Sequence, residues 1–353
     1  MRIGIVGCGA IHGTHIAAIE GIDGACVSGF YDILPERSLA ASAETGKPAF
    51  DSLENLLSAS DGVAVCVPSG THAEIGIAAA RAGKHVLVEK PIEVTLNKAQ
   101  TLVQECRSAG VRLGVISQHR FASEIRRLKD TVDEGGLGPL IEGDASIKWY
   151  RTQAYYDSGD WRGTWALDGG GCLMNQGIHY IDMIQWVMGG VASVQAQVRT
   201  AAHRIEVEDV ATALVEYRCG AIGVIQGSTS FYPGFAERLE VHGRYGSVLI
   251  EGDRIRTWEI DPSRGEDGSL YGRGVVAQPT PNLRLAAIEP ETEDSPTPQE
   301  RWIAQHRLQI EDFVRSVADN RDPFITGEIA LEPLKVILAI YESARRDGAR
   351  VDL

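Results

Sequence analysis

The first 120 residues alternate short apolar runs with stretches whose apolar residues recur at helical spacing. The apolar runs predict strands at residues 2–7, 25–32, 62–69, 85–90 and 112–117. The stretches between them predict helices at residues 13–22, 36–44, 52–59, 72–83 and 97–110. Strands and helices that alternate in this way form a parallel sheet with helices on both faces. We therefore expect an α/β fold whose first part is a doubly wound, Rossmann-like domain that binds a nucleotide.

The pattern changes at about residue 140, where the apolar runs become longer and glycine turns separate them. Such runs favour a second, α+β domain built on a mostly antiparallel sheet. Its expected strands are residues 140–150, 193–201, 209–219, 221–230 and 238–252, and its expected helices are residues 173–189, 300–318 and 328–347. We assign residues 1–120 to the nucleotide-binding domain and residues 121–353 to the substrate domain, with the closing helices free to pack back on the first.

Residues 276–299 are rich in proline and show no regular periodicity. A segment of this length without regular structure is usually a functional loop or a mobile excursion, and the sequence leaves both open.

Composition narrows the possible partners. The 353 residues carry a formal net charge of −14 and 44% of them are apolar. A chain of this size builds a full core, whereas its negative surface repels nucleic acid and anionic membranes. No apolar stretch approaches the ~18 residues of a membrane span, and the sequence starts directly on a strand-like run, so we expect a cytoplasmic protein. The six cysteines form no C-x-x-C pair and no zinc-spaced group with histidine, which favours reduced thiols and no metal site.

The stretch "GCGAIHG", residues 7–13, follows the first apolar run and resembles a dinucleotide-binding turn. Gly7 permits the tight turn, Gly9 lets the backbone approach a pyrophosphate, and the helix N-terminus beyond offers free N–H groups. His12 occupies the third glycine position, which serves helix packing, and Gly13 beside it is expected to relieve the crowding. An ordinary strand-to-helix turn is the alternative. We predict pyrophosphate contacts from Gly7, Gly9, Ala10, Ile11 and His12.

Asp32 ends the second predicted strand, 23 residues after Gly9. A carboxylate near this spacing accepts hydrogen bonds from an adenosine ribose, and the alternative is a cap for the following helix. The next residue is Ile33 rather than a cation, and a carboxylate repels a 2′-phosphate. The sequence therefore favours NAD over NADP, although Arg37 lies close enough in sequence to keep NADP open.

Two further motifs, "VEKPI" with Glu89, Lys90 and Pro91, and "GGGCLMNQGIHYID" over residues 169–182, resemble the glucose-fructose oxidoreductase, inositol dehydrogenase and rhizopine catabolism (Gfo/Idh/MocA) family. With the glycine turn and the closing "AIYESAR", the likeness covers essentially the whole chain. The resemblance implies a large open sheet used for oligomer contacts, hence a homodimer or homotetramer. It also implies NAD(P)-dependent oxidation or reduction of a secondary alcohol on a sugar, cyclitol or nucleotide-sugar. In one departure, Asn175 stands where relatives often have aspartate.

Oxidation of a secondary alcohol needs a base for the hydroxyl proton. His179 is the expected base because imidazole exchanges protons near neutral pH, and Lys90 is expected to stabilise the developing negative charge. The alternatives are a polar residue on an amphipathic helix for His179 and a solvated strand end for Lys90. An amide cannot remove a proton at neutral pH, so we assign Asn175 to substrate hydroxyls.

Other candidates lie at predicted strand ends or before the glycine run. Pro68, Thr71 and His72 resemble the family's loop at the nicotinamide ribose, and His72 is alternatively an ordinary residue of a helix N-terminus. Glu89 and Gln118 complete the predicted cofactor contacts, with Glu89 expected to orient the local structure. Arginine suits an anionic group and aromatic faces suit sugar rings, although aromatic residues are more often core residues. The expected substrate contacts are Arg120, Trp161 and Arg162, with His119 and Trp165 nearby.

Three functions follow. The first is an NAD-dependent dehydrogenase or reductase acting on a polyhydroxylated ring. The second is a glycosidase that cleaves by transient oxidation and regenerates the nicotinamide, so that the absence of net NADH separates it from the first. The third is a non-catalytic NAD-binding regulator, which has no need of Lys90 and His179 together.

Overall fold

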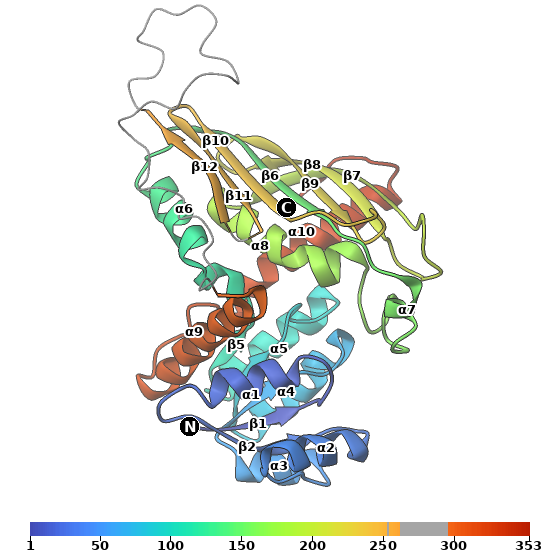
Figure 1. Cartoon of the computed structure of the whole chain (residues 1–353), viewed down its shortest axis with the longest axis vertical. Helices are drawn as coiled ribbons and strands as arrows, with labels where there is room; N and C mark the ends of the chain where they lie inside the picture. The colour runs from blue at the N-terminus through green and yellow to red at the C-terminus, as the bar shows by residue number, and fades with distance from the viewer. Residues whose placement is uncertain (253, 262–295) are drawn as a thin grey trace, which may run out of the picture.

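Two β-sheets organise the chain in the computed structural model, which describes residues 1–252, 254–261 and 296–353 (Figure 1). A five-stranded sheet, sheet A, lies in the N-terminal part, and an eight-stranded sheet, sheet B, lies in the C-terminal part. The proline-rich segment predicted at 276–299 falls outside the described residues as far as residue 295. The expected division of the chain at residue 120 stays a prediction.

Sheet A has the strand order β2-β1-β3-β4-β5 and every pairing in it is parallel, which confirms the Rossmann-like prediction. Strand order reverses between β1 and β3, and ligands of such folds bind beyond the carboxyl ends of the strands at this point. The strands are β1 (Arg2–Val6), β2 (Cys26–Tyr31), β3 (Gly62–Val65), β4 (His85–Val88) and β5 (Leu113–Val115). The helices are α1 (His12–Ile19), α2 (Pro35–Thr45), α3 (Leu53–Ala59), α4 (His72–Arg81) and α5 (Leu96–Ser108), all close to their predicted positions.

Sheet B has the order β12-β11-β10-β6-β9-β8-β7-β13, and its pairings are antiparallel except that between β6 and β9. Buried and less buried residues alternate along β6 and β8 because only one face is covered by helices. The strands are β6 (Leu140–Lys148), β7 (Val191–Arg199), β8 (Val210–Tyr217), β9 (Ile222–Ser228), β10 (Arg238–Gly243), β11 (Gly246–Glu251), β12 (Arg254–Ile260) and β13 (Val351–Asp352). The strands β12 and β13 were not expected from the sequence, and the run expected as one strand at residues 238–252 forms the antiparallel pair β10 and β11.

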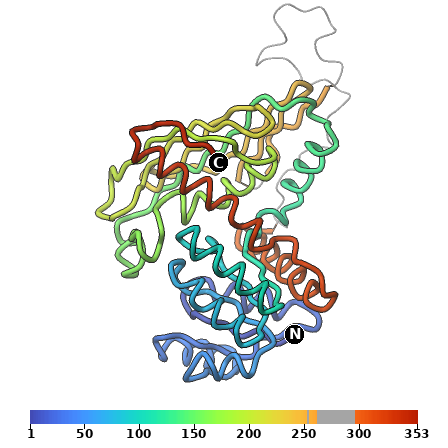
Figure 2. The backbone as a smooth tube through the Cα atoms, turned by 180° about the vertical axis from the view of Figure 1, so that it is seen from behind, coloured from blue at the N-terminus to red at the C-terminus, as the bar shows by residue number. Residues whose placement is uncertain are grey.

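Helices α9 (Pro298–Ala318) and α10 (Gly327–Arg345) join the two halves of the molecule (Figures 1 and 2). Helix α9 packs against α1, and its Ile310 and Phe313 are buried with the sheet A residues Ile3 and Ile5. Helix α10 contacts both α5 and β7, so it touches elements of both sheets. The shorter helices α6 (Ser123–Asp133), α7 (Gln153–Tyr156) and α8 (Ile178–Val187) belong to the C-terminal half. No helix in the described ranges has the length and apolar character needed to cross a lipid bilayer.

The helix expected at residues 173–189 begins differently from the prediction. Residues Cys172–Gly177 form a π-helical turn, and only then does α8 start. Buried Glu208 accepts hydrogen bonds from the backbone N–H groups of Gly171 at 2.9 Å and Leu173 at 3.0 Å. A Cβ atom on Gly171 would stand 1.7 Å from the carbonyl oxygen of Glu208, so only glycine fits there. These long-range contacts set the unusual start of the helix, and helical periodicity gives no sign of them.

Candidate active site

The glycine turn leads from β1 into α1 at the carboxyl edge of sheet A. Gly7 has φ +93°, and a Cβ atom there would lie 2.7 Å from the backbone of Cys66, so this position requires glycine. A Cβ atom on Gly9 would meet nothing within 4 Å, which leaves the backbone approachable. The same holds for Gly13, so the crowding that it was expected to relieve beside His12 is absent. His12 itself is half-buried at the first position of α1.

Asp32 lies directly beside this turn. Its Oδ2 accepts from the backbone N–H of Cys8 at 2.7 Å, and its Oδ1 accepts from that of Leu34 at 2.9 Å. The carboxylate is therefore part of the glycine turn rather than the cap of α2, whose N-cap residue is Leu34. Since a carboxylate has about four acceptor positions, two remain for ribose hydroxyls. The open side of Gly9 and the charge of Asp32 together fit the pyrophosphate and ribose of a dinucleotide.

Lys90 stands at the end of β4, and its ammonium group reaches across to the π-helical turn. Its Nζ donates to the backbone oxygen of Asn175 at 2.8 Å and lies 3.4 Å from the side-chain Oδ1 of the same residue. The Nδ2 of Asn175 in turn donates to Oδ1 of Asp168 at 2.8 Å. Burial lowers the pKa of Lys90, while the charges of Glu89 and Asp168 oppose that change.

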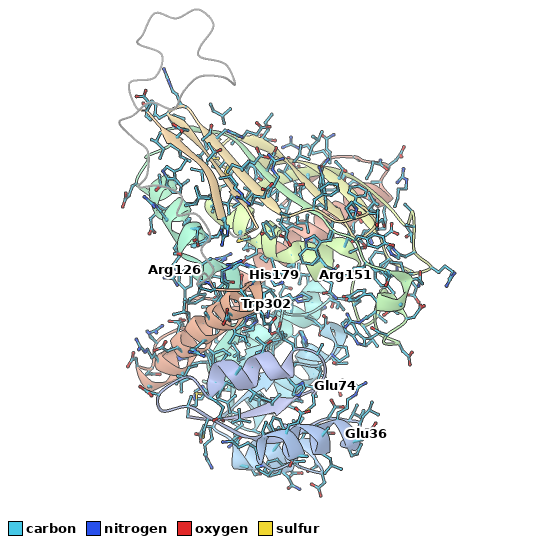
Figure 3. All side chains as sticks on the ribbon, viewed as in Figure 1. Glu36, Glu74, Arg126, Arg151, His179 and Trp302 are labelled. Carbon is cyan, nitrogen blue, oxygen red and sulfur yellow. The ribbon has the colours of Figure 1, made fainter. Side chains whose placement is uncertain are left out.

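His179 is 8% exposed on the first turn of α8. Its ring packs edge-on against His119, with centroids 5.0 Å apart, and against Trp302 of α9, with centroids 5.9 Å apart. Figure 3 labels His179 and Trp302 in the region between the two sheets. Burial, reinforced by the charge of Lys90, holds the pKa of His179 well below its usual value. The imidazole is therefore neutral at physiological pH and able to accept a proton.

Glu89, the residue before Lys90, is buried and pairs with His15 of α1. Its Oε1 is 2.7 Å from Nε2 of His15, and its Oε2 accepts from the backbone N–H of Lys90 at 3.1 Å. Burial alone would raise the pKa of Glu89, but the hydrogen bond and charge of His15 lower it to about 2. The carboxylate thus stays charged and holds the backbone that carries Lys90.

Arg162 and Trp161 come together with Tyr155 of α7. Nη1 of Arg162 donates to the Tyr155 hydroxyl at 2.7 Å, and the guanidinium lies 4.4 Å from the Tyr155 ring centroid and 4.5 Å from that of Trp161. The amide nitrogen of Gln176 also donates to the Tyr155 hydroxyl, at 3.1 Å. Trp165 takes another place, since its indole N–H donates to the backbone of Glu206. Arg162, Trp161 and Tyr155 form an aromatic and cationic surface next to the π-helical turn.

Other predicted site residues are occupied by contacts within the protein. The guanidinium of Arg120 is 2% exposed and forms a bidentate pair with Asp182 of α8. Both ring nitrogens of His72 face backbone carbonyl oxygens, that of Pro91 at 2.8 Å and that of Val67 at 2.9 Å. Burial lowers the pKa of His72, so one of these nitrogens carries the proton. These two side chains hold the elements around the site rather than present free groups to it.

The remaining predicted cofactor contacts lie after β3 and β5. Pro68 precedes the turn η1 (Ser69–Thr71) and Thr71 ends it, and the Thr71 hydroxyl donates to the Pro68 carbonyl at 2.7 Å. Gln118 begins the turn η2 (Gln118–Phe121) and is fully buried. Neither polar atom of its amide has a partner among the described residues, which leaves the amide available to a bound group.

Several residues near the site were not predicted from the sequence. Asp168 stands directly before the glycine run, so the sequence could have marked it as a candidate carboxylate near Asn175. His15 lies in an apolar helix and Trp302 lies far along the chain, so only folding brings them to Glu89 and His179. Tyr155 belongs to the same aromatic stretch as Trp161, which was predicted as a substrate contact.

Two family models match the chain. One, described as "Oxidoreductase family, NAD-binding Rossmann fold", matches residues 1–117, and the other, "GFO/IDH/MocA C-terminal domain", matches residues 125–249. The myo-inositol 2-dehydrogenase of Thermotoga maritima is 28% identical over 348 residues, which cover 93% of this chain and 91% of that protein.

Solved structures resemble the chain over its full length. The WlbA dehydrogenase of Bordetella pertussis, in complex with NADH and UDP-GlcNAcA, is 33% identical with a TM-score of 0.83, covering 100% of this chain and 98% of that one. The WlbA dehydrogenase of Chromobacterium violaceum, with the same two ligands, is 31% identical with a TM-score of 0.84, covering 100% and 96%.

Proposed function

Because this chain belongs to the GFO/IDH/MocA oxidoreductase family and is an NAD-dependent dehydrogenase or reductase of CH–OH groups, we propose that its substrate is an acidic sugar, as a nucleotide-sugar or a free ring. The observation that carries this proposal is the position of Arg162. Its guanidinium lies against the rings of Tyr155 and Trp161, close enough to Lys90 for the two charges to interact. Among the described residues, its guanidinium donates to the Tyr155 hydroxyl and interacts with the charge of Asp168, and it forms no ion pair. A cation held in this way suits a carboxylate on the substrate. Similarity to two dehydrogenases solved with UDP-GlcNAcA supports the same class.

The proposed chemistry divides between two side chains. Neutral His179 takes the proton of the substrate hydroxyl, and the Lys90 ammonium holds the same oxygen as negative charge develops. A bound nicotinamide would supply the hydride acceptor. Asn175 contacts a neighbouring hydroxyl, and Arg162 and Trp161 bind the rest of the ring. In the reverse direction the same groups return the proton, so the site serves oxidation and reduction alike.

The proposed cofactor site follows the carboxyl edge of sheet A. The turn from Gly7 to His12 holds the pyrophosphate, and Asp32 binds the adenosine ribose. The loops that contain Pro68, Thr71 and Gln118 would contact the nicotinamide end of the bound cofactor. Glu89 and His72 act indirectly, since each is bonded to the backbone around Lys90. Arg120 likewise supports His179 through its ion pair with Asp182.

A substrate comparison tests this function. The enzyme with NAD should form NADH, followed by absorbance, with UDP-GlcNAcA at a kcat/KM at least tenfold above that with the neutral UDP-GlcNAc. Arg162→Met should reduce that ratio, because it keeps the length of the side chain and removes the charge. Equal rates with the acid and the neutral sugar would exclude the acidic class. Cleavage of a glycosidic bond without net NADH would instead favour the glycosidase.

We expect Asp32→Ala to narrow the preference for NAD over NADP. The variant loses the ribose acceptor, which weakens NAD binding about tenfold, and it removes the repulsion of a 2′-phosphate. Titration of both cofactors, followed by tryptophan fluorescence, measures the two affinities. Asp23→Ala, on the exposed loop before β2, is the matched control. A clear NADP preference in the unmutated enzyme would contradict the role given to Asp32.

We expect a homodimer or homotetramer formed through the uncovered face of sheet B. Leu214 of β8 is 58% exposed and Ile222 of β9 is 62% exposed, on neighbouring strands. Light scattering should give at least twice the monomer mass of 38.2 kDa. Leu214→Glu should shift the protein toward the monomer, whereas Leu39→Glu on exposed α2 should not. A monomer at micromolar concentration before any substitution would contradict the prediction.

A further inference from the structure

We propose that Asp168 is a positioning residue that acts on Lys90 through Asn175. It supplies the negative charge that an aspartate at position 175 would have placed beside Lys90. Asp168 is 3% exposed, and its side chain bonds to the backbone of Gly163 and to Asn175. The inference rests on the proposed function, because it assigns a further residue to the same site.

The surroundings of Asp168 require a carboxylate. Its Oδ2 accepts from the backbone N–H of Gly163 at 2.8 Å, and its Oδ1 accepts from Nδ2 of Asn175 at 2.8 Å. Both oxygens therefore face donors. An amide at position 168 would turn its own N–H₂ toward one of these donors and leave a buried donor unpaired. Position 168 thus tolerates an acceptor on both sides and nothing else of the same size.

The pairing with Asp168 decides how Asn175 meets Lys90. Because Nδ2 of Asn175 points to Asp168, its Oδ1 points to Nζ of Lys90, 3.4 Å away. The amide carries no charge, so on the side of Asn175 the negative potential at Lys90 comes from the Asp168 carboxylate, in addition to that of Glu89. Asn175 therefore presents an oriented acceptor, and Asp168 is what orients it.

Besides burial, which lowers the pKa of Lys90, three charged groups act on its protonation. Glu89 and Asp168 favour its ammonium form, while Arg162 opposes it, and Lys90 itself lowers the pKa of neighbouring His179. Of these groups, Glu89 is already committed to His15. Removing the charge of Asp168 should therefore lower the pKa of Lys90 further and increase the fraction of neutral amine at neutral pH.

The test exchanges the two side chains. Asp168→Asn leaves two donors facing an amide, and Asn175→Asp places two carboxylates within hydrogen-bond distance, where both cannot ionise. The double variant Asp168→Asn/Asn175→Asp pairs every donor again. Its amide oxygen accepts from Gly163, its amide nitrogen donates to the new carboxylate, and the second oxygen of that carboxylate faces Lys90. If Asp168 acts through charge and orientation, the exchange rescues what either single substitution damages.

The first readout needs no substrate. Cyanate carbamylates the neutral amine, so the pH dependence of Lys90 carbamylation, followed by peptide mass spectrometry, reports its pKa in the intact enzyme. At pH 7 the rate should rise several-fold in Asp168→Asn and return toward the original value in the double variant. Asp144→Asn in sheet B, whose carboxylate also accepts from a backbone N–H, is the matched control. An unchanged Lys90 rate in Asp168→Asn, with the protein folded, would overturn the inference.

The second readout is turnover with the acidic sugar. Each single variant should lose about tenfold or more in kcat, and the double variant should recover most of that loss. A double variant as impaired as the two single variants combined would also overturn the inference, since independent structural damage adds. The two readouts separate the failures: rescue of the Lys90 rate without any sugar oxidation in the unmutated enzyme would keep the pairing and reject the proposed substrate.

Discussion

Replacing His179 with alanine should lower kcat about 100-fold or more, while the affinity for NAD stays nearly unchanged. The substitution removes the group that takes the hydroxyl proton, and loss of a general base usually costs this much. NAD affinity should persist because the glycine turn and Asp32, which are proposed to hold the dinucleotide, lie on other elements. Steady-state NADH formation measures kcat, and cofactor titration measures the affinity.

The pH profile gives this prediction a second measurement. His179 must be neutral to accept a proton, and burial places its pKa well below 6.5. Activity should therefore hold as pH falls through 6.5 and decline only when pH reaches the lowered pKa of His179. A profile that falls with a midpoint at or above 6.5 would show that another group is the base. His242→Ala in β10, which removes a half-buried histidine that bonds to Ser247, should leave kcat unchanged.

Asn175→Ala separates binding from chemistry. It should mainly raise KM, as loss of a substrate contact does, and it should also lower kcat by about the tenfold expected for Asp168→Asn, because both variants break the chain from Asp168 to Lys90. If Asn175→Ala abolished turnover while His179→Ala kept most of it, the assigned roles would be wrong. The base would then be sought at Tyr155 or Tyr156, although burial raises the pKa of both hydroxyls and so disfavours the tyrosinate form that would accept the proton.

Lys90→Ala should lower kcat by about 100- to 1,000-fold, the range found when a donor to a developing oxyanion is removed. Lys90 is the cation that reaches the π-helical turn, where its Nζ bonds to Asn175. Lys90→Arg should restore little activity, because the planar guanidinium is larger than the ammonium and cannot occupy the same point. Kinetics of both variants with the same substrate measure the effect.

Lys84→Ala is the matched control for Lys90→Ala. Lys84 follows α4 and its Nζ donates to the backbone oxygen of Ser60, away from the proposed site. It should change kcat by less than about twofold. An increase in KM with kcat unchanged in Lys90→Ala would mean that Lys90 only binds the substrate, and the stabilisation of charge would have to come from elsewhere.

Much of the cofactor half of the site was predictable because its signals are local. A glycine at φ +93° in Gly7 and a carboxylate at the end of the next strand are requirements of one turn and one neighbouring strand. The two motifs that contain Lys90 and His179 could also be recognised, because each is a short stretch of sequence that resembles the family. Comparison with known proteins over the length of the chain confirms the family and NAD as cofactor.

The rest of the site depends on contacts between distant segments. Arg120 was expected to face substrate, but its partner Asp182 lies on another helix, and a cation next to a buried carboxylate pairs with it. The helix expected at residues 173–189 contains both Asn175 and His179, but Asn175 lies in the π-helical turn that precedes α8, to which Glu208 is bonded. Asp168 entered the site only through this turn.

The sequence by itself determined the two-sheet architecture, the dinucleotide turn and the identity of the two main catalytic candidates, because hydrophobic periodicity, glycine geometry and short motifs act over a few residues. Only the tertiary structure decided which charges meet. The pairs Glu89 with His15 and Asp168 with Asn175, and the neutral state of His179, arise where burial removes water and strengthens each electrostatic contact. Burial is a property of the packed chain, so the protonation and orientation of the catalytic group become visible only after folding.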